Sequence, residues 1–401
     1  MIKKRTKNKI LAFSLIFTMG SLPMVNPYAA VIWAPGTSQS SGPGAVGGGA
    51  GETDWSKVAQ GAMTIDPSIP KGTVNFTSME VPDPIVKVAD MYTYDFMVHD
   101  LEELRKEYSD HMSYRSIGST YDGRNIYEVT VGNPNAKNHV LIPAAIHARE
   151  YITTNLVMKQ IEYALYYYDT GGWDGKRLSD MFEDTCLHFV PMANPDGVSI
   201  SQFGLDGIRN EELREGIEKI YADDLAAGRT ADPLDKYLVR WKANARGVNL
   251  NQNFDANWLE AKGSAEVPSY SYYSGAYPES ELESSALARL FRSRSYKAVI
   301  NYHSMGEVIY WDIENNKVRE KSRFLANNML ALTGYQMLYS GEGGGFKDYV
   351  QLYGSGTPSV TLEVGKGEAP VPSEQMESIW AQNKFVWLYA LKYAAEGYYQ
   401  Y

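Results

Sequence analysis

Short apolar runs alternate with longer stretches of helical periodicity along this chain from about residue 89 onward. A short apolar run bounded by turn residues is typical of a buried strand, whereas a longer periodic stretch indicates a helix that buries one face. Such alternation predicts an α/β domain with a mixed sheet covered by helices. We expect strands at residues 126–131, 139–145, 187–193, 298–302 and 359–364, and helices at 96–108, 153–168, 210–227, 279–295, 317–332 and 373–395.

Residues 1–30 have the composition of a secretory signal. Five basic residues lie between positions 3 and 9, an apolar region covers 10–25, and Ala29 and Ala30 suit cleavage. The apolar region is shorter than the roughly 20 residues that a membrane-spanning helix needs. We expect a secreted protein, extracellular or in the cell wall, with no stable membrane insertion after cleavage. An uncleaved anchor is the alternative.

Residues 31–88 are expected to form a Gly/Ser-rich linker followed by a lead-in segment. Positions 35–51 carry almost no bulky side chains, which is typical of a flexible linker. Positions 52–88 show little periodicity, and either a loose lead-in or a short pro-segment would account for them. The remaining residues, 89–401, are expected to form a single domain.

The charge and the cysteine count exclude several classes of function. The net charge is −10, and the first thirty residues carry five basic and no acidic side chains, so the rest of the chain is more acidic still. Nucleic-acid binding requires a basic face, so we expect no nucleic-acid partner. Cys186 is the only cysteine, which excludes an intramolecular disulfide. It lies in a strand-like run, which favours a buried, inert thiol over a nucleophile.

The motif His147-Ala-Arg-Glu150 follows directly after the apolar run at 139–145. A His and a Glu three residues apart at a strand end can turn toward the same point. The imidazole and the carboxylate can then bind one Zn²⁺ at about 2.0–2.2 Å.

Two further motifs also lie at the ends of apolar runs. His303 follows the run at 298–300, and Glu363 ends the run that starts at Ser359. Ligands in α/β folds gather at the carboxyl ends of strands, so these residues should meet His147 and Glu150 there. Taken alone, each His could be a core residue and Glu363 a surface acid. Together, two His and a Glu as ligands with a free Glu as base are the set required for zinc-assisted amide hydrolysis.

The order of these motifs resembles that of the zinc carboxypeptidases. The resemblance covers roughly residues 92–398, and each motif is weak by itself. It implies an α/β fold with a mixed, eight-stranded type of sheet flanked by helices, in one catalytic domain at 89–401. The motifs are His147-Ala-Arg-Glu150, Asn194-Pro-Asp-Gly197, Gly247-Val-Asn-Leu-Asn251, Tyr302-His303-Ser304 and Leu362-Glu363, with Ser280-Glu-Leu-Glu283 as a helix start.

The resemblance implies a role for each matching residue. His147, Glu150 and His303 would hold one zinc ion. Glu363 would be the general base and later the general acid, acting on water and on the leaving amine. The substrate would be a peptide, and a monomer is expected. The other histidines lack such a context and are predicted to be structural; they are His99, His111, His139 and His188.

Three more positions match the family's substrate contacts. Tyr339, on a Gly-rich segment, would cover the substrate and donate a hydrogen bond; otherwise it is one of 30 tyrosines. Arg149 would touch the substrate or else be a solvated charge at the rim. Ser304 follows the second ligand histidine and would line the substrate site.

The chain also departs from the family pattern. Carboxypeptidases hold the substrate's terminal carboxylate with an Asn-Arg pair, but here Asn251 is followed by Gln252, which cannot replace a bidentate arginine. Asn249 stands where the family has an Asp that orients a ligand histidine, a change that can cost about 10–100-fold in metal affinity or activity. The arginine that polarises the carbonyl is best matched by Lys242, with Arg246 as the alternative.

Lys347 falls at the floor of the family's specificity pocket, where a cation would pair with an acidic group of the substrate; otherwise it is a loop lysine in solvent. With Lys347, Gln252 in place of the arginine, and the pattern Trp241-Lys-Ala-Asn244…Arg246-Gly-Val, the chain resembles the branch that cleaves γ-D-glutamyl–diamino acid bonds in peptidoglycan stem peptides. One alternative is a carboxypeptidase that removes acidic C-terminal residues. Another is a catalytically silent protein that binds the cell wall. A serine hydrolase is disfavoured because the chain has no Gly-x-Ser-x-Gly.

Overall fold

The computed structural model describes residues 80–173, 176–260, 263–340 and 343–396. All of them lie within the compact unit Asp54–Tyr401. The expected signal, the linker and most of the lead-in lie outside the described residues. Residues 80–88 belong to that expected lead-in, yet Val81 and Val86 are buried in the main core. Among the described residues, no helix is both long enough and apolar enough to cross a membrane.

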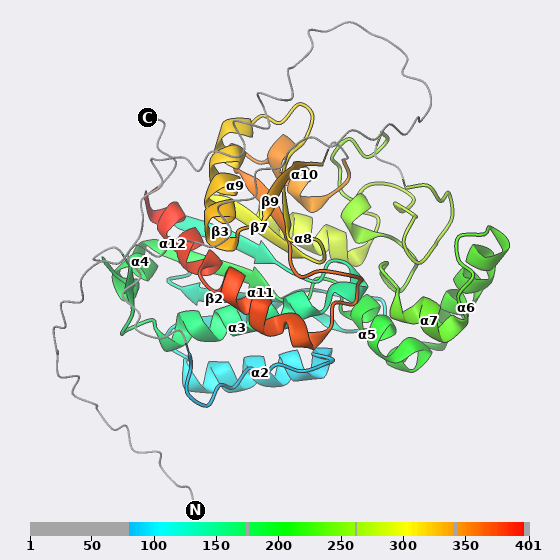
Figure 1. Ribbon diagram of the computed structural model, residues 1–401, viewed down its shortest axis with the longest axis horizontal. Coiled ribbons are helices and arrows are strands. Elements are labelled where there is room, and N and C mark those ends of the chain that lie inside the picture. Colours follow the sequence, from blue (N-terminus) through cyan, green and yellow to red (C-terminus); the bar gives the residue numbers. More distant parts are fainter. Residues whose placement is uncertain (1–79, 174–175, 261–262, 341–342, 397–401) are drawn as a thin grey trace, which may run out of the picture. The chain divides into compact units, whose positions relative to one another are not determined.

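The centre of the molecule is a mixed sheet of eight strands, which confirms the predicted fold class (Figure 1). Its order is β1-β2-β6-β3-β7-β10-β8-β9. The central strands β6, β3, β7 and β10 run parallel, whereas β1 and β2 add antiparallel strands at one edge and β8 is antiparallel to β10. The strands are β1 (Met112–Ser119), β2 (Asn125–Gly132), β3 (Asn138–Pro143), β6 (Thr185–Val190), β7 (Ala298–His303), β8 (Val308–Asp312), β9 (Gln336–Tyr339) and β10 (Ser359–Glu363).

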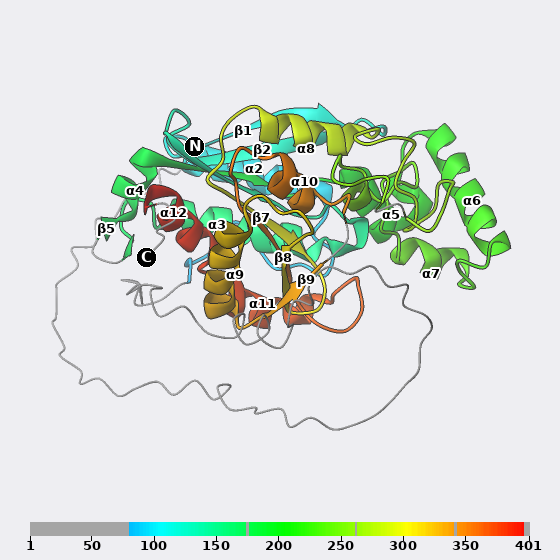
Figure 2. The same ribbon diagram turned by 90° about the horizontal axis from the view of Figure 1, so that it is seen from above.

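Helices cover both faces of this sheet (Figure 2). One face packs against the larger group: α2 (Tyr94–Glu107), α3 (Ile152–Tyr166), α4 (Leu178–Asp184), α9 (Arg319–Thr333), α11 (Met376–Asn383) and α12 (Val386–Glu396). The other face packs against α8 (Leu282–Arg292) and α10 (Phe346–Tyr353).

Strand β7 shows how the sequence builds the two layers. Side chains alternate between the faces of a strand. Ile300 and Tyr302 therefore join the larger core, and Val299 joins the smaller one. Every residue of β7 is buried. A strand covered on both faces reads as a continuous apolar run, which is why the sequence predicted it.

A third, smaller core lies beside the sheet. It is built by α6 (Glu211–Ala226) and α7 (Leu234–Val239), which lie together at one end of the molecule (Figure 1). Trp241, just after α7, is fully buried in this core. Two further elements lie close to the sheet's carboxyl edge: the short 3-10 helix η1 (Ala148–Glu150) and α5 (Pro195–Phe203).

One predicted helix, 373–395, is wrong as a single element. It is divided into a 3-10 turn at Ser373–Gln375, then α11, then α12. The break follows Asn383. The backbone carbonyl of Asn383 accepts a hydrogen bond from Gln160 Nε2 at 3.0 Å, which comes from α3. The side-chain amide of Asn383 donates to Tyr335 and to the carbonyl of Ile379. These tertiary contacts are not visible in the local periodicity.

Candidate active site

Three neighbouring strands end at one edge of the sheet and carry the predicted catalytic residues there. His303 is the last residue of β7, and Glu363 is the last residue of β10. These two residues are directly opposite each other in the parallel register of β7 and β10. His147 follows β3, which pairs with β7 on its other side. The topology therefore brings together residues more than two hundred positions apart.

The side chains of His147, Glu150 and His303 converge on one point. Glu150 Oε1 lies 2.8 Å from His147 Nδ1, and Glu150 Oε2 lies 3.0 Å from His303 Nδ1. The two Nδ1 atoms are 3.1 Å apart. Two histidine nitrogens bound to one tetrahedral Zn²⁺ lie about 3.3 Å apart. All three residues are buried, and the donor set and its spacing fit a zinc ion.

Local hydrogen bonds hold these ligands in place. Glu150 ends η1, directly before α3, and its Oε2 also accepts a hydrogen bond from the backbone N–H of Ser304 at 3.2 Å. Ser304 is buried, and its hydroxyl has no hydrogen-bond partner among the described residues. The backbone directly after the second histidine is therefore tied to the carboxylate that bridges the pair.

The two acids at the site, Glu150 and Glu363, differ in their pKa values. Burial raises the pKa of Glu363 to about 7; Glu150 adds to this rise, whereas His303, Lys242 and Arg149 oppose it. Burial would also raise the pKa of Glu150, but His147 and His303 hold it well below its usual range. The bridging carboxylate thus stays ionised, while Glu363 can take up or release a proton near neutral pH.

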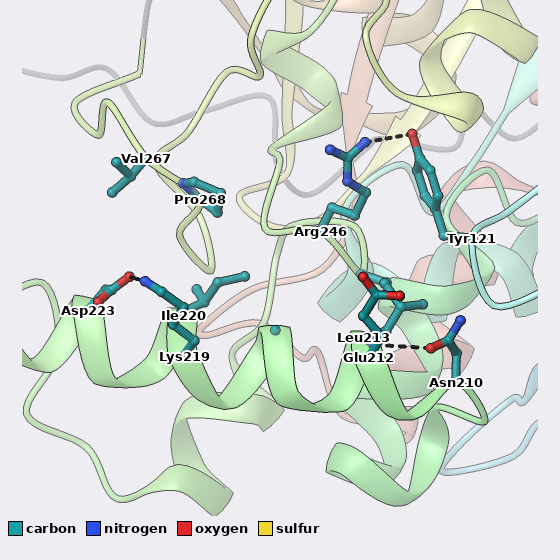
Figure 3. A pocket seen from close by; sticks show the side chains of 12 residues that line it. Tyr121, Asn210, Glu212, Leu213, Lys219, Ile220, Asp223, Arg246, Val267 and Pro268 are labelled. Atoms are coloured by element: carbon teal, nitrogen blue, oxygen red, sulfur yellow. Dashed lines mark hydrogen bonds and ion pairs between the residues drawn. The ribbon is translucent and has the colours of Figure 1, made fainter.

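Lys242 lies within the electrostatic reach of both acids. Burial lowers its pKa, and the charges of Glu150 and Glu363 oppose this shift. The alternative, Arg246, points elsewhere: its Nη1 donates to Tyr121 at 2.8 Å and lies 3.6 Å from Glu281 (Figure 3). The structure therefore places Lys242, rather than Arg246, beside the convergent ligands.

Arg246 borders a separate cavity of about 530 Å³ beside α6, and Figure 3 shows the side chains that line it. Leu213 and Ile220 of α6 and Pro268 from a facing loop contribute apolar walls. None of the predicted ligands or catalytic residues lines this cavity. It is therefore distinct from the site at the strand ends.

Of the other predicted substrate contacts, Arg149 lies close to the ligands, whereas Tyr339 is exposed and is influenced by other charges. Arg149 is half-buried and affects the charge of Glu363. Its Nη1 donates to the carbonyl of Arg240 at 3.3 Å, and its buried Nε has no hydrogen-bond partner among the described residues. Tyr339 ends β9 and is 42% exposed. The charges that act on Tyr339 come from other residues than the ligands, chiefly Asp312 and Glu314.

The segment where the family holds a terminal carboxylate is neutral here. Asn249 Nδ2 donates to Gln252 Oε1 at 3.2 Å and to the carbonyl of Ser271 at 3.0 Å. Asn251 Oδ1 accepts a hydrogen bond from the N–H of Phe346 at 3.0 Å. These hydrogen bonds of Asn249 do not involve His147, whose buried Nε2 lacks a hydrogen-bond partner in the described part of the chain.

Lys347 is buried within α10 rather than solvated. Its ammonium forms a short ion pair with the carboxylate of Asp348. It also lies 3.4 Å from the carbonyl of Asp312 and 3.4 Å from Gln351 Oε1. The positive charge of Lys347 is therefore already compensated within the protein, so an acidic group of the substrate would have to compete with Asp348.

Asn194 is a positioning residue to which the sequence analysis assigned no role. Its Nδ2 donates to the carbonyl of Ile146 at 3.2 Å and to the carbonyl of Ala243 at 3.1 Å. These residues are the direct neighbours of His147 and Lys242. One amide thus joins two segments of the site. The motif Asn194-Pro-Asp-Gly197 was the available signal, although its spacing does not reveal these acceptors.

Asn244 anchors the Lys242 segment from the other side. Its Nδ2 donates to Glu281 Oε2 at 2.9 Å and to Glu283 Oε2 at 3.2 Å. Burial raises the pKa of Glu283 to about 8, and Asp196 and Glu281 add to this rise. The helix-start motif Ser280-Glu-Leu-Glu283 therefore supports the site through Asn244.

Comparisons with known proteins agree with this geometry. A model of the zinc carboxypeptidase family matches residues 97–386. Gamma-D-glutamyl-L-diamino acid endopeptidase 1 of Lysinibacillus sphaericus is 30% identical over 303 residues, which cover 75% of this chain and 72% of that protein.

Two solved structures share the fold. The crystal structure of thrombin activatable fibrinolysis inhibitor has a TM-score of 0.60 at 19% identity, and the match covers 79% of this chain and 78% of that one. Carboxypeptidase A from Helicoverpa armigera has a TM-score of 0.56 at 19% identity, covering 78% and 74%. At these identities the likeness shows the fold alone. The family match over most of the described domain leads to one conclusion: the chain belongs to the zinc carboxypeptidase family and is a metallopeptidase.

Proposed function

We propose that this protein is an extracytoplasmic zinc peptidase that cleaves γ-D-glutamyl–diaminopimelate bonds in bacterial cell-wall peptides. The observation that carries the choice of substrate is the neutral segment at Asn249–Gln252. A free α-carboxylate at the chain end needs a cation to hold it, and Gln252 supplies none. The name of the Lysinibacillus relative, a γ-D-glutamyl-L-diamino acid endopeptidase, supports the same bond type.

His147, Glu150 and His303 would hold one zinc ion. When bound, such an ion lowers the pKa of water toward 7 and polarises a carbonyl group. Glu363, whose pKa burial raises to about 7, takes a proton from the attacking water and returns it to the leaving amine. Lys242 lies near both acids and offers a positive charge to the oxygen on which negative charge develops.

Arg149 is the cation we assign to a substrate carboxylate. Its half-buried side chain acts on the charge of Glu363, and its Nε has an unused donor among the described contacts. Tyr339 and Ser304 complete the proposed substrate site, with Asn251 and Gln252 offering neutral amides. We place Lys347 there with a smaller role, because Asp348 already compensates its charge.

The alternative function is a carboxypeptidase that removes acidic C-terminal residues. It would need Lys347 to leave Asp348 for the substrate side chain, and another cation to hold the terminus. A silent wall-binding protein is a weaker candidate still. Binding alone does not require a buried acid such as Glu363, which lies opposite the ligand histidine His303 in the sheet.

The test is a cleavage assay with zinc-loaded protein. The substrates are L-Ala-γ-D-Glu-meso-diaminopimelate, the same peptide with an α-linked Glu, and ordinary peptides with varied C-termini, and mass spectrometry locates the cut. We expect cleavage only after γ-D-Glu, and none by Glu363→Gln. Cleavage of ordinary C-terminal residues alone would overturn the substrate assignment in favour of the carboxypeptidase. No cleavage with zinc bound would overturn both.

Secretion is a separate part of the proposal and has its own test. Residues 1–30 have the composition of a signal, although they lie outside the described residues. The intact mass of protein collected outside producing cells should correspond to a chain that begins after Ala29 or Ala30. A full-length chain retained in the cytoplasm would contradict this.

A further inference from the structure

A second cluster of ligand-type side chains lies at the other end of β3 from His147. His139 is near the start of β3, Cys186 is near the start of β6, and His188 lies in the middle of β6. His139 is opposite Cys186 in the parallel register. Cys186 and His188 are two residues apart, so they project from the same face of the sheet. One donor atom from each of the three lies within 4.8 Å of the others.

The two histidines face each other directly. His139 Nδ1 lies 2.9 Å from His188 Nε2. The second ring nitrogen of His188, Nδ1, lies 2.7 Å from Glu128 Oε1. An ionised carboxylate accepts the proton of Nδ1–H, which leaves the lone pair of Nε2 directed at His139. Metal-binding histidines are oriented in this way, with a carboxylate on the nitrogen that faces away from the metal.

The spacing is close to that of the candidate active site. The facing nitrogens are 2.9 Å apart here and 3.1 Å apart between His147 and His303. Both values are slightly below the roughly 3.3 Å expected for two nitrogens on a tetrahedral Zn²⁺. A small outward movement of either ring would admit an ion. His139 is half-buried, so this position can be reached from solvent.

Charged groups from three other elements face the cluster. Glu128 on β2 is paired with Arg115 of β1 at 2.6 Å. Arg294, between α8 and β7, places Nη1 3.4 Å from His188 Nε2. Arg294 Nε and the hydroxyl of Tyr296 are buried without hydrogen-bond partners among the described residues. A bound cation would displace the contact between Arg294 and His188, so Arg294 should weaken the site without blocking it.

We propose that His139, Cys186 and His188 form a second metal site, which takes a thiophilic divalent cation such as Zn²⁺. Two imidazoles and a thiolate are ligands that zinc and cobalt accept, whereas magnesium and calcium prefer oxygen. The Cys186 thiol releases its proton to solvent as the sulfur binds the ion. Among the described residues, no unpaired carboxylate like that of Glu363 lies beside this cluster, so the ion would be structural, joining β3 to β6.

The test uses the unique cysteine. The full-length protein is loaded with Co²⁺, the bound metal is counted by elemental analysis, and the near-ultraviolet thiolate-to-cobalt charge-transfer band is recorded. The proposed active site contains no sulfur, so only Cys186 can produce this band. We expect two metal equivalents with the band in the unmodified protein, but one equivalent without the band in Cys186→Ser. Peptide hydrolysis should be unchanged in this variant.

Further variants separate this site from the active site and from loss of folding. His303→Ala should lose the active-site metal and keep the band. His188→Gln should lose the band, and Arg294→Gln should bind Co²⁺ more tightly at Cys186. Near-ultraviolet circular dichroism checks that each variant is folded. A folded, unmodified protein that binds a single equivalent without the band, even in excess Co²⁺, would overturn the proposal and leave His139 and His188 as a hydrogen-bonded pair.

Discussion

Two histidine pairs lie at opposite ends of β3, and their surroundings differ in where the carboxylate stands. Between His147 and His303, the carboxylate of Glu150 contacts both facing nitrogens. At the other end, Glu128 lies behind His188, and Arg294 lies in front of it. A glutamate can therefore serve as a metal ligand or as a support for a ligand histidine. Which role it takes depends on whether the fold places its carboxylate on the metal side of the imidazole ring or on the far side.

The difference extends to the protonation of His303 but not to that of His147, whose pKa burial lowers to about 3. Burial lowers the pKa of His139 to about 4, and His188 and Arg294 add to this fall. Burial would also lower the pKa of His303, but the hydrogen bond and charge of Glu150 outweigh it and raise that pKa. In the described part of the chain, Glu363 lies beside the first pair, whereas the acid beside the second pair, Glu128, is engaged by His188 and Arg115. Ligand geometry is therefore shared between the two clusters, while the capacity for proton transfer is confined to one.

The largest expected effect separates the two clusters by catalysis. Glu363→Gln removes the group that carries the proton, so kcat should fall by about 10²–10⁴-fold. Zinc content, measured by elemental analysis, should be unchanged. His139→Gln is the matched control at the second cluster and should keep kcat within about twofold, since general acid–base catalysis does not reach that end of β3. Equal losses of kcat in both variants would contradict the assignment of catalysis to the first histidine pair alone.

The next effect concerns stability at the second cluster. Burial would raise the pKa of Glu128, but the hydrogen bond from His188 and the charges of His188, Arg115 and Arg294 lower it. Glu128→Gln should therefore lower the free energy of unfolding by on the order of 2–3 kcal/mol at pH 7. The stabilising term is present above the unfolded pKa of about 4.3, and it is lost as the pH falls below that value.

Denaturant unfolding of the unmodified protein and of Glu128→Gln, at pH 7 and near pH 3.5, measures this effect. The two proteins should differ less in the acid. A difference that stays constant between the two pH values would show that Glu128 contributes through its shape rather than its charge.

A smaller effect concerns the pH dependence of catalysis. The base form of Glu363 is required, so kcat/KM should fall as the pH drops below its pKa, which is about 7 before the influence of a bound cation. Lys242 lowers that pKa. Lys242→Met should therefore move the acidic limb upward by about one pH unit. A limb that stays in place while kcat falls would confine Lys242 to stabilising the developing negative charge.

The smallest effect tests the missing carboxylate behind His147. The side chain of Asn249 makes its hydrogen bonds with Gln252, Ser271 and Asn251 rather than with His147. Asn249→Asp should therefore change zinc affinity by no more than a few-fold. A competition titration against a chelator measures this. A gain of about 10–100-fold would mean that the new carboxylate reaches His147 Nε2 and supports it as Glu128 supports His188.

The strands of the sheet centre were predictable because they are buried on both faces. The runs that became β3, β6, β7 and β10 are rich in apolar and β-branched residues with few polar interruptions, so the strand pattern stood out. β1, by contrast, is half-exposed, and β8 and β9 are short, so their periodicity was too weak to be identified. The ligands could be located because each lies at or just after the end of one of the central strands.

The surroundings of the site could not be predicted in the same way. The contacts of Lys347 with Asp348 and of Asn249 with Gln252 are local, but they depend on side-chain conformations that a sequence pattern does not specify. Asn194 and Asn249 donate to carbonyls of residues far along the chain, which local sequence does not reveal. The same applies to His139 and His188, which the sequence presents as separate core histidines. Their proximity depends on the register between β3 and β6, which the sequence alone does not specify.

The hydrogen bond between Asn249 and Gln252 also bears on the shape of the substrates that can enter. A cation at this position would recognise a chain end and reject a polymer that continues past it. Two amides that satisfy each other make no such demand. Under the proposed function, a stem peptide joined to its neighbour in a network would therefore fit as well as a free one.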